Sequence, residues 1–161
     1  MTSFARYESP LGGITLAGSG DALTGLWFDA QRPAGSPGRE GAWLPVFDEA
    51  LRWLDVYFSG KVPDFTPPLD LAGTPFQREV WSILLEIPYG RTMGYGEIAA
   101  RVALRRGLRR MSSQAVGGAV GRNPVSLIVP CHRVIGADGS LVGYAGGLGL
   151  KSSLLRIEGV L

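Results

Sequence analysis

A proline-rich segment divides this sequence into two parts and constrains its fold more than any other feature. Residues 59–73 contain Pro63, Pro67 and Pro68 together with two glycines and few apolar runs. Proline lacks the backbone donor that helices and central strands need, so we expect an extended crossing between two folding units. The expected units are an N-terminal domain over residues 1–72 and a C-terminal domain over residues 73–161.

Short strands and one helix are predicted for the first unit. Apolar and polar residues alternate over residues 4–8, 14–17 and 23–28, which is typical of a strand meander. Residues 31–41 hold two prolines and three glycines and are predicted to be a loop. Over residues 44–58 the apolar positions Phe47, Leu51, Leu54 and Phe58 follow a helical period. The N-terminal domain is therefore expected to be a small α/β layer.

Helices dominate the prediction for the second unit. Thr74 to Gln77 form a capping box that opens a helix burying Val80, Ile83, Leu84 and Ile87, and residues 88–90 end it. Residues 95–103 and a segment capped by Ser112 are predicted to be two further helices. The loop between them carries arginines at positions 105, 106, 109 and 110, and two short helices with a basic connection are typical of a helix-turn-helix.

The last forty residues are predicted to hold short extended pieces and a closing helix. The apolar run 125–129 reads as a strand, and residues 137–140 read as a turn between two extended pieces that resembles a wing. Residues 148–158 close the chain as a helix with Gly159 at its C-terminal cap. The C-terminal domain is thus expected to be mainly α, with a winged helix-turn-helix.

Charge is distributed unevenly between the two units. Residues 1–72 carry 5 basic and 9 acidic groups, whereas residues 73–161 carry 11 and 5, so a net charge of +2 conceals halves of −4 and +6. A basic domain indicates an anionic partner, most commonly nucleic acid. Arginine provides 14 of the 16 basic residues, which suits phosphate recognition but equally follows from a GC-rich genome.

Several function classes are excluded by simple counting. No apolar run approaches the roughly 18 residues that a membrane span needs, and the N-terminus lacks the pattern of a signal peptide. We therefore expect a cytoplasmic protein without a membrane partner. Cys131 and His132 are the only cysteine and histidine, so neither a disulfide framework nor a Cys/His metal site can form. No metal or cofactor is expected.

The sole cysteine and the sole histidine are adjacent. A single cysteine is most often a small buried apolar residue. Here Pro130 precedes it, Arg133 follows closely, and an apolar strand leads into it, which favours a thiolate held in an electropositive setting. In an extended segment neighbouring side chains face opposite ways, so His132 would need a turn or a relay water to accept the thiol proton.

Two segments of small residues also stand out. Residues 143–147 form a glycine-rich loop, which is either a flexible linker or the cover of a pocket beside Cys131. Residues 112–119 form a predicted helix of tiny side chains. Each glycine in a helix costs about 1 kcal/mol, so this helix must either pack closely on another helix or approach a DNA groove.

Together these motifs resemble the O6-alkylguanine-DNA alkyltransferases. The resemblance rests on Pro130 to Val134, on Gln114 to Ala119, on Asn123-Pro124, on Gly143 to Gly147, and on Lys151, Leu154-Leu155 and Glu158-Gly159. It covers residues 74–159, while the N-terminal half matches only in its pattern of elements. The resemblance implies a small ribonuclease H-like sheet with a helix, then the winged helix-turn-helix domain.

The same resemblance implies a role for each site residue. Cys131 would take the alkyl group from O6-alkylguanine, and possible substrates include O4-alkylthymine. His132 and Glu158 would support the thiolate through a water, Tyr95 would donate to the flipped base, and Asn123 would brace the cysteine segment. The substrate-binding residues would be Val134, Tyr144, Ala145 and Lys151. The DNA-binding residues would be Ser112, Ser113, Gln114, Ala115, Gly117 and Gly118, which would let the helix enter the minor groove.

One residue departs from the family's pattern. The family has an arginine just before Ala115 that fills the gap left by the flipped base, whereas this chain has Gln114. The preceding loop is longer than in the family and carries extra arginines. We hypothesise that Arg109 or Arg110 supplies the missing charge.

Three functional hypotheses follow from these observations. The first is a single-turnover repair alkyltransferase that acts as a monomer on double-stranded DNA containing O6-alkylguanine. The second is a non-reactive damage-binding relative, against which the presence of Cys131 argues because such relatives replace the cysteine. The third is a winged-helix regulator with a structural cysteine, which would bind one DNA sequence and would not be alkylated.

Overall fold

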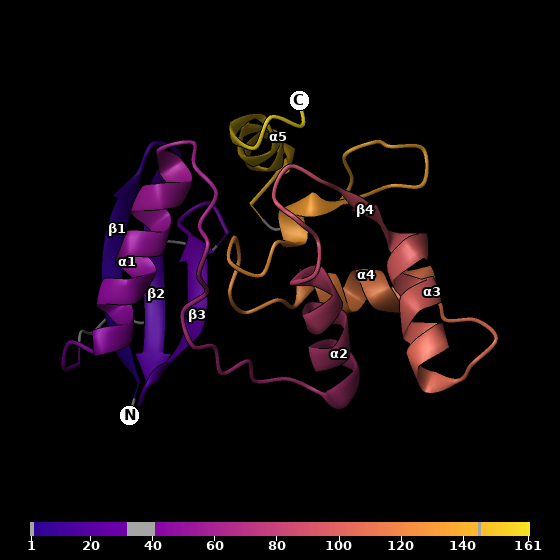
Figure 1. Ribbon diagram of the computed structural model, residues 1–161, viewed down its shortest axis with the longest axis horizontal. Coiled ribbons are helices and arrows are strands. Elements are labelled where there is room, and N and C mark those ends of the chain that lie inside the picture. Colours follow the sequence, from indigo (N-terminus) through magenta and orange to yellow (C-terminus); the bar gives the residue numbers. More distant parts are fainter. Residues whose placement is uncertain (1, 32–40, 145) are drawn as a thin grey trace. The chain divides into compact units, whose positions relative to one another are not determined.

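The computed structural model describes residues 2–31, 41–144 and 146–161, which form two compact units. One unit comprises Met1–Ala72 together with Pro124–Ser126, and the other comprises Gly73–Asn123 and Leu127–Leu161. Figure 1 shows a sheet with one helix in the first unit and a group of helices in the second. The predicted loop over residues 31–41 falls largely on residues 32–40, outside the described ranges.

An antiparallel meander forms the centre of the first unit. Strands β1 (Ser3–Ser9), β2 (Gly12–Ser19) and β3 (Ala22–Phe28) pair in chain order, with a register shift at Ala17/Gly18. Helix α1 (Pro45–Phe58) covers one face of the sheet (Figure 1). Burial alternates at the start of β1, as successive side chains of a strand point to opposite faces, whereas β2 and β3 bury most of their residues. The three strands and the helix predicted from the sequence are confirmed.

The buried face of α1 differs in part from the predicted one. Phe47 and Leu54 are fully buried as expected, but Leu51 and Phe58 are only half-buried. Trp53 and Tyr57 are buried as well, and their rings stack with centroids 5.4 Å apart. Two large rings one helical turn apart bury more area than the leucine, so they set which face of the helix meets the sheet.

Two extended segments cover the outer edge of β3. Leu23 exchanges backbone hydrogen bonds with Pro68 and Asp70, and Leu26 exchanges them with Pro124 and Ser126. An uncovered strand edge invites pairing with other chains, and these short bridges prevent it. The sequence predicted the extended crossing segment, whereas the return of residues 124–126 to this unit was not predicted.

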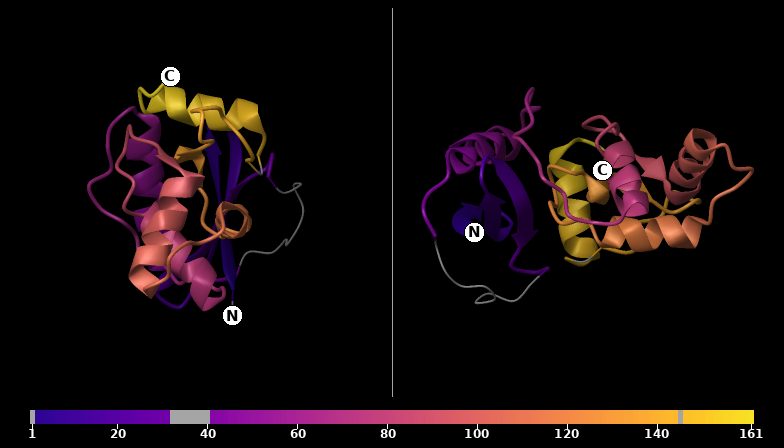
Figure 2. Two further views of the ribbon diagram at one scale, coloured as in Figure 1. Left: turned by 90° about the vertical axis from the view of Figure 1, so that its right-hand side faces the viewer. Right: turned by 90° about the horizontal axis from the view of Figure 1, so that it is seen from below.

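The described residues of the second unit form four α-helices. They are α2 (Pro75–Leu84), α3 (Tyr95–Arg106), α4 (Ser113–Gly121) and α5 (Leu148–Ile157). The Thr74 capping box is formed, with both reciprocal hydrogen bonds present. Helices α2, α3 and α4 pack together (Figures 1 and 2), and the Trp81 indole donates a buried hydrogen bond of 2.8 Å to the Ala119 carbonyl. None of the helices in the described ranges is long and apolar enough to cross a bilayer.

The segment that leads into Cys131 is not the strand that the sequence predicted. Residues 125–129 make only isolated bridges, and Leu127 has a left-handed backbone with φ of 74°. Cys131–Arg133 then form a 3-10 turn, followed by β5 (Val134–Ile135), which pairs in parallel with β4 (Met93–Gly94). A buried turn and a buried strand share the same apolar pattern, so hydrophobicity did not distinguish them.

The closing residues largely agree with the prediction. A turn at residues 136–140 is closed by a hydrogen bond from the Gly136 amide to the Ser140 carbonyl. Of the two extended pieces expected to flank it, β5 is present, whereas residues 141–144 form no strand. Helix α5 ends before Gly159, whose φ of 79° provides the left-handed conformation expected after a helix.

Candidate active site

Cys131 begins the 3-10 turn and is almost entirely buried, with 6% of its surface exposed. Its amide donates to the Val129 carbonyl at 2.8 Å, and its own carbonyl accepts from the Val134 amide. The turn replaces the extended geometry that would have placed His132 on the opposite face. The position of Cys131 is thus fixed by backbone hydrogen bonds on both sides.

His132 and Glu158 form a fully buried pair. The Nε2 atom of His132 lies 2.6 Å from Oε2 of Glu158. Burial alone would raise the pKa of Glu158, but hydrogen bonds and charges from His132 and Arg133 lower it to about 2. Burial lowers the pKa of His132, against the opposing pull of Glu158. At neutral pH the pair is therefore a carboxylate and a neutral imidazole.

The protonation of this pair fixes the imidazole tautomer. A carboxylate accepts hydrogen bonds and donates none, so Nε2 of His132 must carry the proton. Nδ1 then presents a lone pair, and this buried atom has no hydrogen-bond partner within the described part of the chain. A buried acceptor adjacent in sequence to a cysteine is positioned to take up a proton.

The Arg133 guanidinium forms hydrogen bonds with Glu158 and not with the thiol. Its Nε and Nη2 atoms donate to the two carboxylate oxygens at 2.8 and 3.2 Å, while Nη1 donates to the Ile87 carbonyl at 2.8 Å. The Gly90 amide adds a fourth hydrogen bond to this carboxylate, at 3.0 Å. The sequence interpretation placed Arg133 as the cation beside Cys131, and the structure corrects this. Nothing in the spacing of residues 87, 90, 133 and 158 revealed the network.

The charge of Cys131 influences the pKa of three other side chains. Burial raises the pKa of Tyr95 and, more strongly, of Tyr144, and Cys131 adds to both shifts. Burial lowers the pKa of Lys151, and Cys131 opposes that shift. Lys151 is fully buried and donates to the carbonyl oxygens of Val134 and Val142. Lys151, which the sequence analysis assigned to substrate binding, therefore brings a buried positive charge to the surroundings of Cys131.

Tyr95 links the thiol region to helix α4. A methyl group added to Gly117 would lie 3.7 Å from the Tyr95 ring, and one added to Gly143 would lie 3.7 Å from its hydroxyl. The ring thus rests on α4 while the hydroxyl faces the loop that begins at Gly143. Asn123 follows α4, and its side-chain amide donates to the Val129 carbonyl at 2.8 Å. Asn123 therefore connects the end of α4 to the residues leading into Cys131.

Helix α4 presents small residues at its surface. Val116, Ala119 and Val120 are buried, whereas Ser113, Gln114, Ala115 and Gly118 are exposed. A side chain at Gly118 or Gly121 would meet only open space, and one at Gly117 would make ordinary contacts. Close helix packing, one of the two explanations for the tiny residues, therefore does not require these glycines. The Ser112 hydroxyl caps the helix by accepting from the Ala115 amide at 3.1 Å.

The structure thus divides the predicted site residues into two groups. One surrounds the thiol: Cys131, His132, Glu158, Tyr95, Val134, Tyr144, Lys151, with Asn123 behind it. The other lies on or before α4: Ser112, Ser113, Gln114, Ala115, Gly117, Gly118, Arg109, Arg110. Ala145 lies outside the described residues. The residues that sequence reasoning missed are Gly90 and Ile87, which act through backbone atoms that no side-chain motif reveals.

Known proteins match both units of this chain. The family model of the 6-O-methylguanine DNA methyltransferase ribonuclease-like domain matches residues 4–71, and that of the DNA-binding domain matches residues 75–160. Together they define a two-domain DNA methyltransferase class. The chain belongs to the 6-O-methylguanine DNA methyltransferase family.

Individual relatives agree with this assignment over nearly the whole chain. A methylated-DNA--protein-cysteine methyltransferase from Mycobacterium leprae is 50% identical, covering 98% of this chain and 93% of its own. The crystal structure of Mycobacterium tuberculosis O6-methylguanine methyltransferase superposes with a TM-score of 0.83 at 44% identity, covering 98% and 93% of the two chains. A Mycobacterium tuberculosis OGT crystal structure in complex with DNA gives 0.82 at 43% identity, covering 96% and 91%.

Proposed function

We propose that this protein repairs DNA by moving the alkyl group of O6-alkylguanine onto its own Cys131, once per molecule and as a monomer. The observation that carries the proposal is the buried lone pair of His132 Nδ1 next to Cys131, with Nε2 held by a carboxylate whose pKa is about 2. Family membership and the relatives named for this activity support it. Cys131 and His132 lie in the same 3-10 turn, and Glu158, which binds His132, lies at the C-terminal end of α5.

The proposed reaction balances without an added reactant. The thiol proton moves to His132 Nδ1 through a bridging water, and the resulting imidazolium is stabilised by the Glu158 carboxylate. The Cys131 thiolate attacks the alkyl carbon, an S–C bond forms, and the C–O6 bond breaks. The bonding electrons leave with guanine, which ends with the proton that the thiol gave up. Because a thioether is not cleaved by cellular thiols, the protein is consumed.

Tyr95 is the proposed donor to the departing base. Its raised pKa keeps the phenol protonated at neutral pH, so it can donate a hydrogen bond as negative charge develops on guanine. Val134, Tyr144, Ala145 and Lys151 are the proposed substrate-binding residues. The Lys151 ammonium already occupies one acceptor position of the Val134 carbonyl, which leaves the second lone pair for the guanine edge.

We further propose that α3, α4 and the connection between them act as a helix-turn-helix that binds DNA in the minor groove. A helix with ordinary side chains is about 10–12 Å wide, whereas the minor groove is about 6 Å wide, so only a helix face of small residues can approach its floor. The open space beyond Gly118 and Gly121 suits that approach. The damaged nucleotide must be rotated out of the stack to reach Cys131, at a cost of a few kcal/mol.

Intact-mass spectrometry tests the proposal directly. We expect the protein mixed with a duplex containing O6-methylguanine to gain the mass of one methyl group in place of a proton, located on Cys131, and never a second. An unmethylated duplex should leave the mass unchanged. If DNA binds without any mass gain, the protein is a non-reactive damage-binding protein or a sequence-specific regulator, and the proposal is wrong.

Replacing Tyr95 with phenylalanine is expected to slow methyl transfer from duplex DNA by about 100-fold, the usual contribution of one general acid. The ring, and with it the contact to Gly117, is retained, so the melting temperature should stay close to that of the unchanged protein. Single-turnover transfer rates measure the effect. A rate within threefold of the unchanged protein would remove Tyr95 from the mechanism.

A further inference from the structure

The arginines of α3 and those that flank α4 differ in their ion pairs. Three of them on α3 are paired with acidic residues: Arg101 with Glu86 and Glu97, Arg105 with Glu86, and Arg106 with Glu79. The pair with Glu79 joins α3 to α2, those with Glu86 join α3 to the residues just after α2, and the pair with Glu97 lies within α3. All of them neutralise part of the positive charge. Arg109, Arg110 and Arg122 are exposed and make no ion pair within the described ranges.

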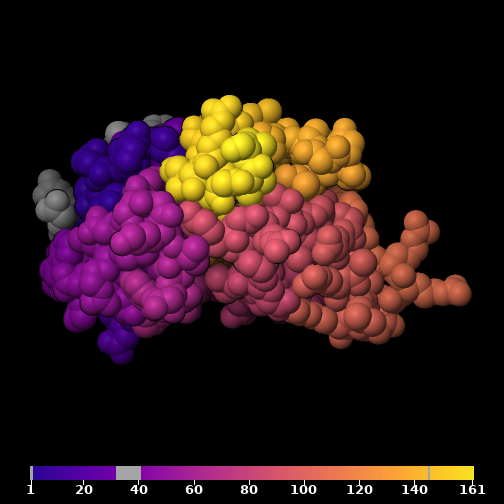
Figure 3. Space-filling view, turned by 45° about the horizontal axis from the view of Figure 1, so that its top comes forward, coloured from indigo at the N-terminus to yellow at the C-terminus, as the bar shows by residue number. Residues whose placement is uncertain are grey.

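Arg78, Arg91 and Arg156 are likewise exposed without an ion pair in the described ranges, but Arg109, Arg110 and Arg122 are the ones that lie at the two ends of α4. Arg109 and Arg110 precede the cap residue Ser112, and Arg122 is the C-terminal cap. A helix of nine residues is about 14 Å long, so cations stand at both ends of a short helix with small exposed side chains. Figure 3 shows side chains of the segment that follows α3, coloured salmon, projecting away from this unit.

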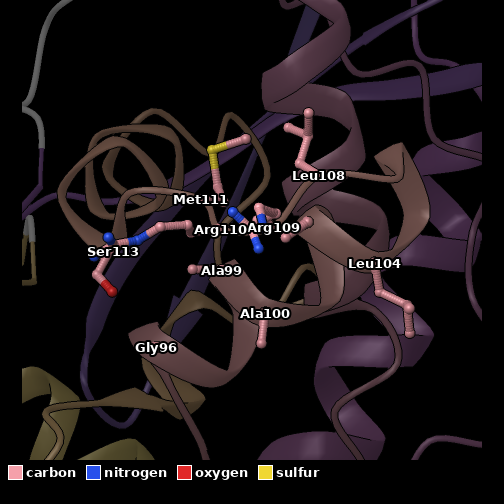
Figure 4. Close-up of a pocket in the computed structure, with 10 residues that line it drawn as sticks. Gly96, Ala99, Ala100, Leu104, Leu108, Arg109, Arg110, Met111 and Ser113 are labelled. Carbon is pink, nitrogen blue, oxygen red and sulfur yellow. The ribbon is translucent and has the colours of Figure 1, made fainter.

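Each end of α4 borders a hollow in the surface of the second unit. Arg109 and Arg110 line one of about 390 Å³ between α3 and Ser113, and Figure 4 shows them with Ser113 on one side and Leu104 on the other. Arg122 lines another, of about 420 Å³, together with Gly118 and Thr74 at the start of α2. Both hollows border the exposed side of α4.

Phosphates fit these positions better than any other anion that the proposed function supplies. The two phosphate strands that border the minor groove lie on either side of a helix placed in it. Guanidinium groups bind phosphate oxygens in a bidentate manner, and exposed arginines without carboxylate partners lose no ion pair on doing so. The paired arginines of α3 would first have to break their bonds to Glu79, Glu86 or Glu97.

We propose that Arg109 and Arg110 at one end of α4 and Arg122 at the other form a phosphate clamp that holds this helix in the minor groove. The clamp rests on the proposed function, since it uses the DNA that the protein repairs. It assigns a role to Arg122, and it separates the binding arginines from the structural ones. Phosphate contacts carry no information about damage, so the clamp acts equally on alkylated and undamaged duplexes.

Salt-dependent binding to a short duplex tests the clamp. The variants are Arg122→Gln and the double variant Arg109→Gln/Arg110→Gln. Each phosphate contact contributes about 0.9 to the slope of log affinity against log salt. We expect the slope to fall by about 0.9 for Arg122→Gln and by about 0.9 to 1.8 for the double variant. Affinity at 0.1 M salt should fall by about fivefold to tenfold per contact, equally for both duplexes.

Two matched controls remove the same charge elsewhere. Arg105→Gln deletes a paired arginine, and Arg156→Gln deletes an exposed arginine on α5. Both should leave the slope unchanged. The clamp is wrong if Arg122→Gln and the double variant keep the original slope, or if the controls lower it as much, because net charge alone would then explain the effect.

Transfer from the free base O6-methylguanine separates the clamp from the proposed function. The free base has no phosphates, so the clamp variants should react with it at the original rate. Failure of the unchanged protein to accept a methyl group from any substrate would contradict the proposed function, while the salt slopes would still decide on the clamp.

Discussion

Replacing Cys131 with serine is expected to abolish methyl transfer, with a loss of at least about a thousandfold in the single-turnover rate. A serine hydroxyl stays protonated at neutral pH, and oxygen is a weaker nucleophile than sulfur toward saturated carbon. Serine is close to cysteine in size, so the 3-10 turn and its backbone hydrogen bonds to Val129 and Val134 should persist. Intact-mass analysis and the rate of product formation measure the effect.

DNA binding provides the control for this variant. The small-residue face of α4 and the arginines at its ends lie apart from the thiol in the sequence and are unchanged, so affinity for duplex DNA should remain within about twofold. Cys131→Ala should behave in the same way, which would show that no residual serine chemistry is involved. A serine variant that still removes the methyl group would overturn the assignment of Cys131 as nucleophile.

The sequence carried enough information to predict the elements that depend on local patterns. The strand meander, the Thr74 capping box and the left-handed Gly159 all follow from residue spacing and backbone preference, and the structure has each of them. The adjacency of Cys131 and His132 likewise drew attention to the thiol without any structural knowledge. These predictions succeed because neighbouring residues determine the outcome.

Long-range partners could not be predicted in the same way. Glu158 binds His132, Arg133 and the Gly90 amide, and no periodicity relates these positions. Arg105 pairs with Glu86 just after α2, and Arg106 pairs with Glu79 on α2, and both pairs depend on how α2 and α3 pack. The sequence therefore could not tell these paired arginines from the unpaired Arg109 and Arg110. The strand predicted over residues 125–129 is wrong, and the sequence left open whether a turn or a water relates His132 to the thiol, because a buried turn is as apolar as a buried strand.

Replacing Glu158 with glutamine is expected to destabilise the protein and to slow methyl transfer. The carboxylate accepts four hydrogen bonds, from Nε2 of His132, from two nitrogens of Arg133 and from the Gly90 amide. An amide can accept only through its oxygen, and its NH2 group faces donors. Arg133 would then be a buried cation without its counter-charge, which typically costs about 3–5 kcal/mol. Loss of the anchor for His132 should lower the transfer rate by about 100-fold.

Acid pH provides a second, independent readout of the same carboxylate. Its pKa falls from 4.5 to about 2 on folding, so it contributes about 3 kcal/mol of stability above pH 4.5, which is lost as the pH falls toward 2. His132 has a lowered pKa in the folded state, so its contribution is lost earlier, as the pH falls below 6.5. The stability difference between Glu158→Gln and the unchanged protein should therefore shrink between pH 4.5 and pH 2.

Urea unfolding at a series of pH values tests this expectation. Glu97→Gln is the matched control, because Glu97 is an exposed carboxylate paired with Arg101 and should change stability by less than about 0.5 kcal/mol at any pH. If the free energy of unfolding of Glu158→Gln falls short by the same amount at pH 7 and at pH 3, the lowered pKa of Glu158 in the folded protein is wrong. The loss must come from an ionised Glu158, because only the charged form satisfies His132 and Arg133 together.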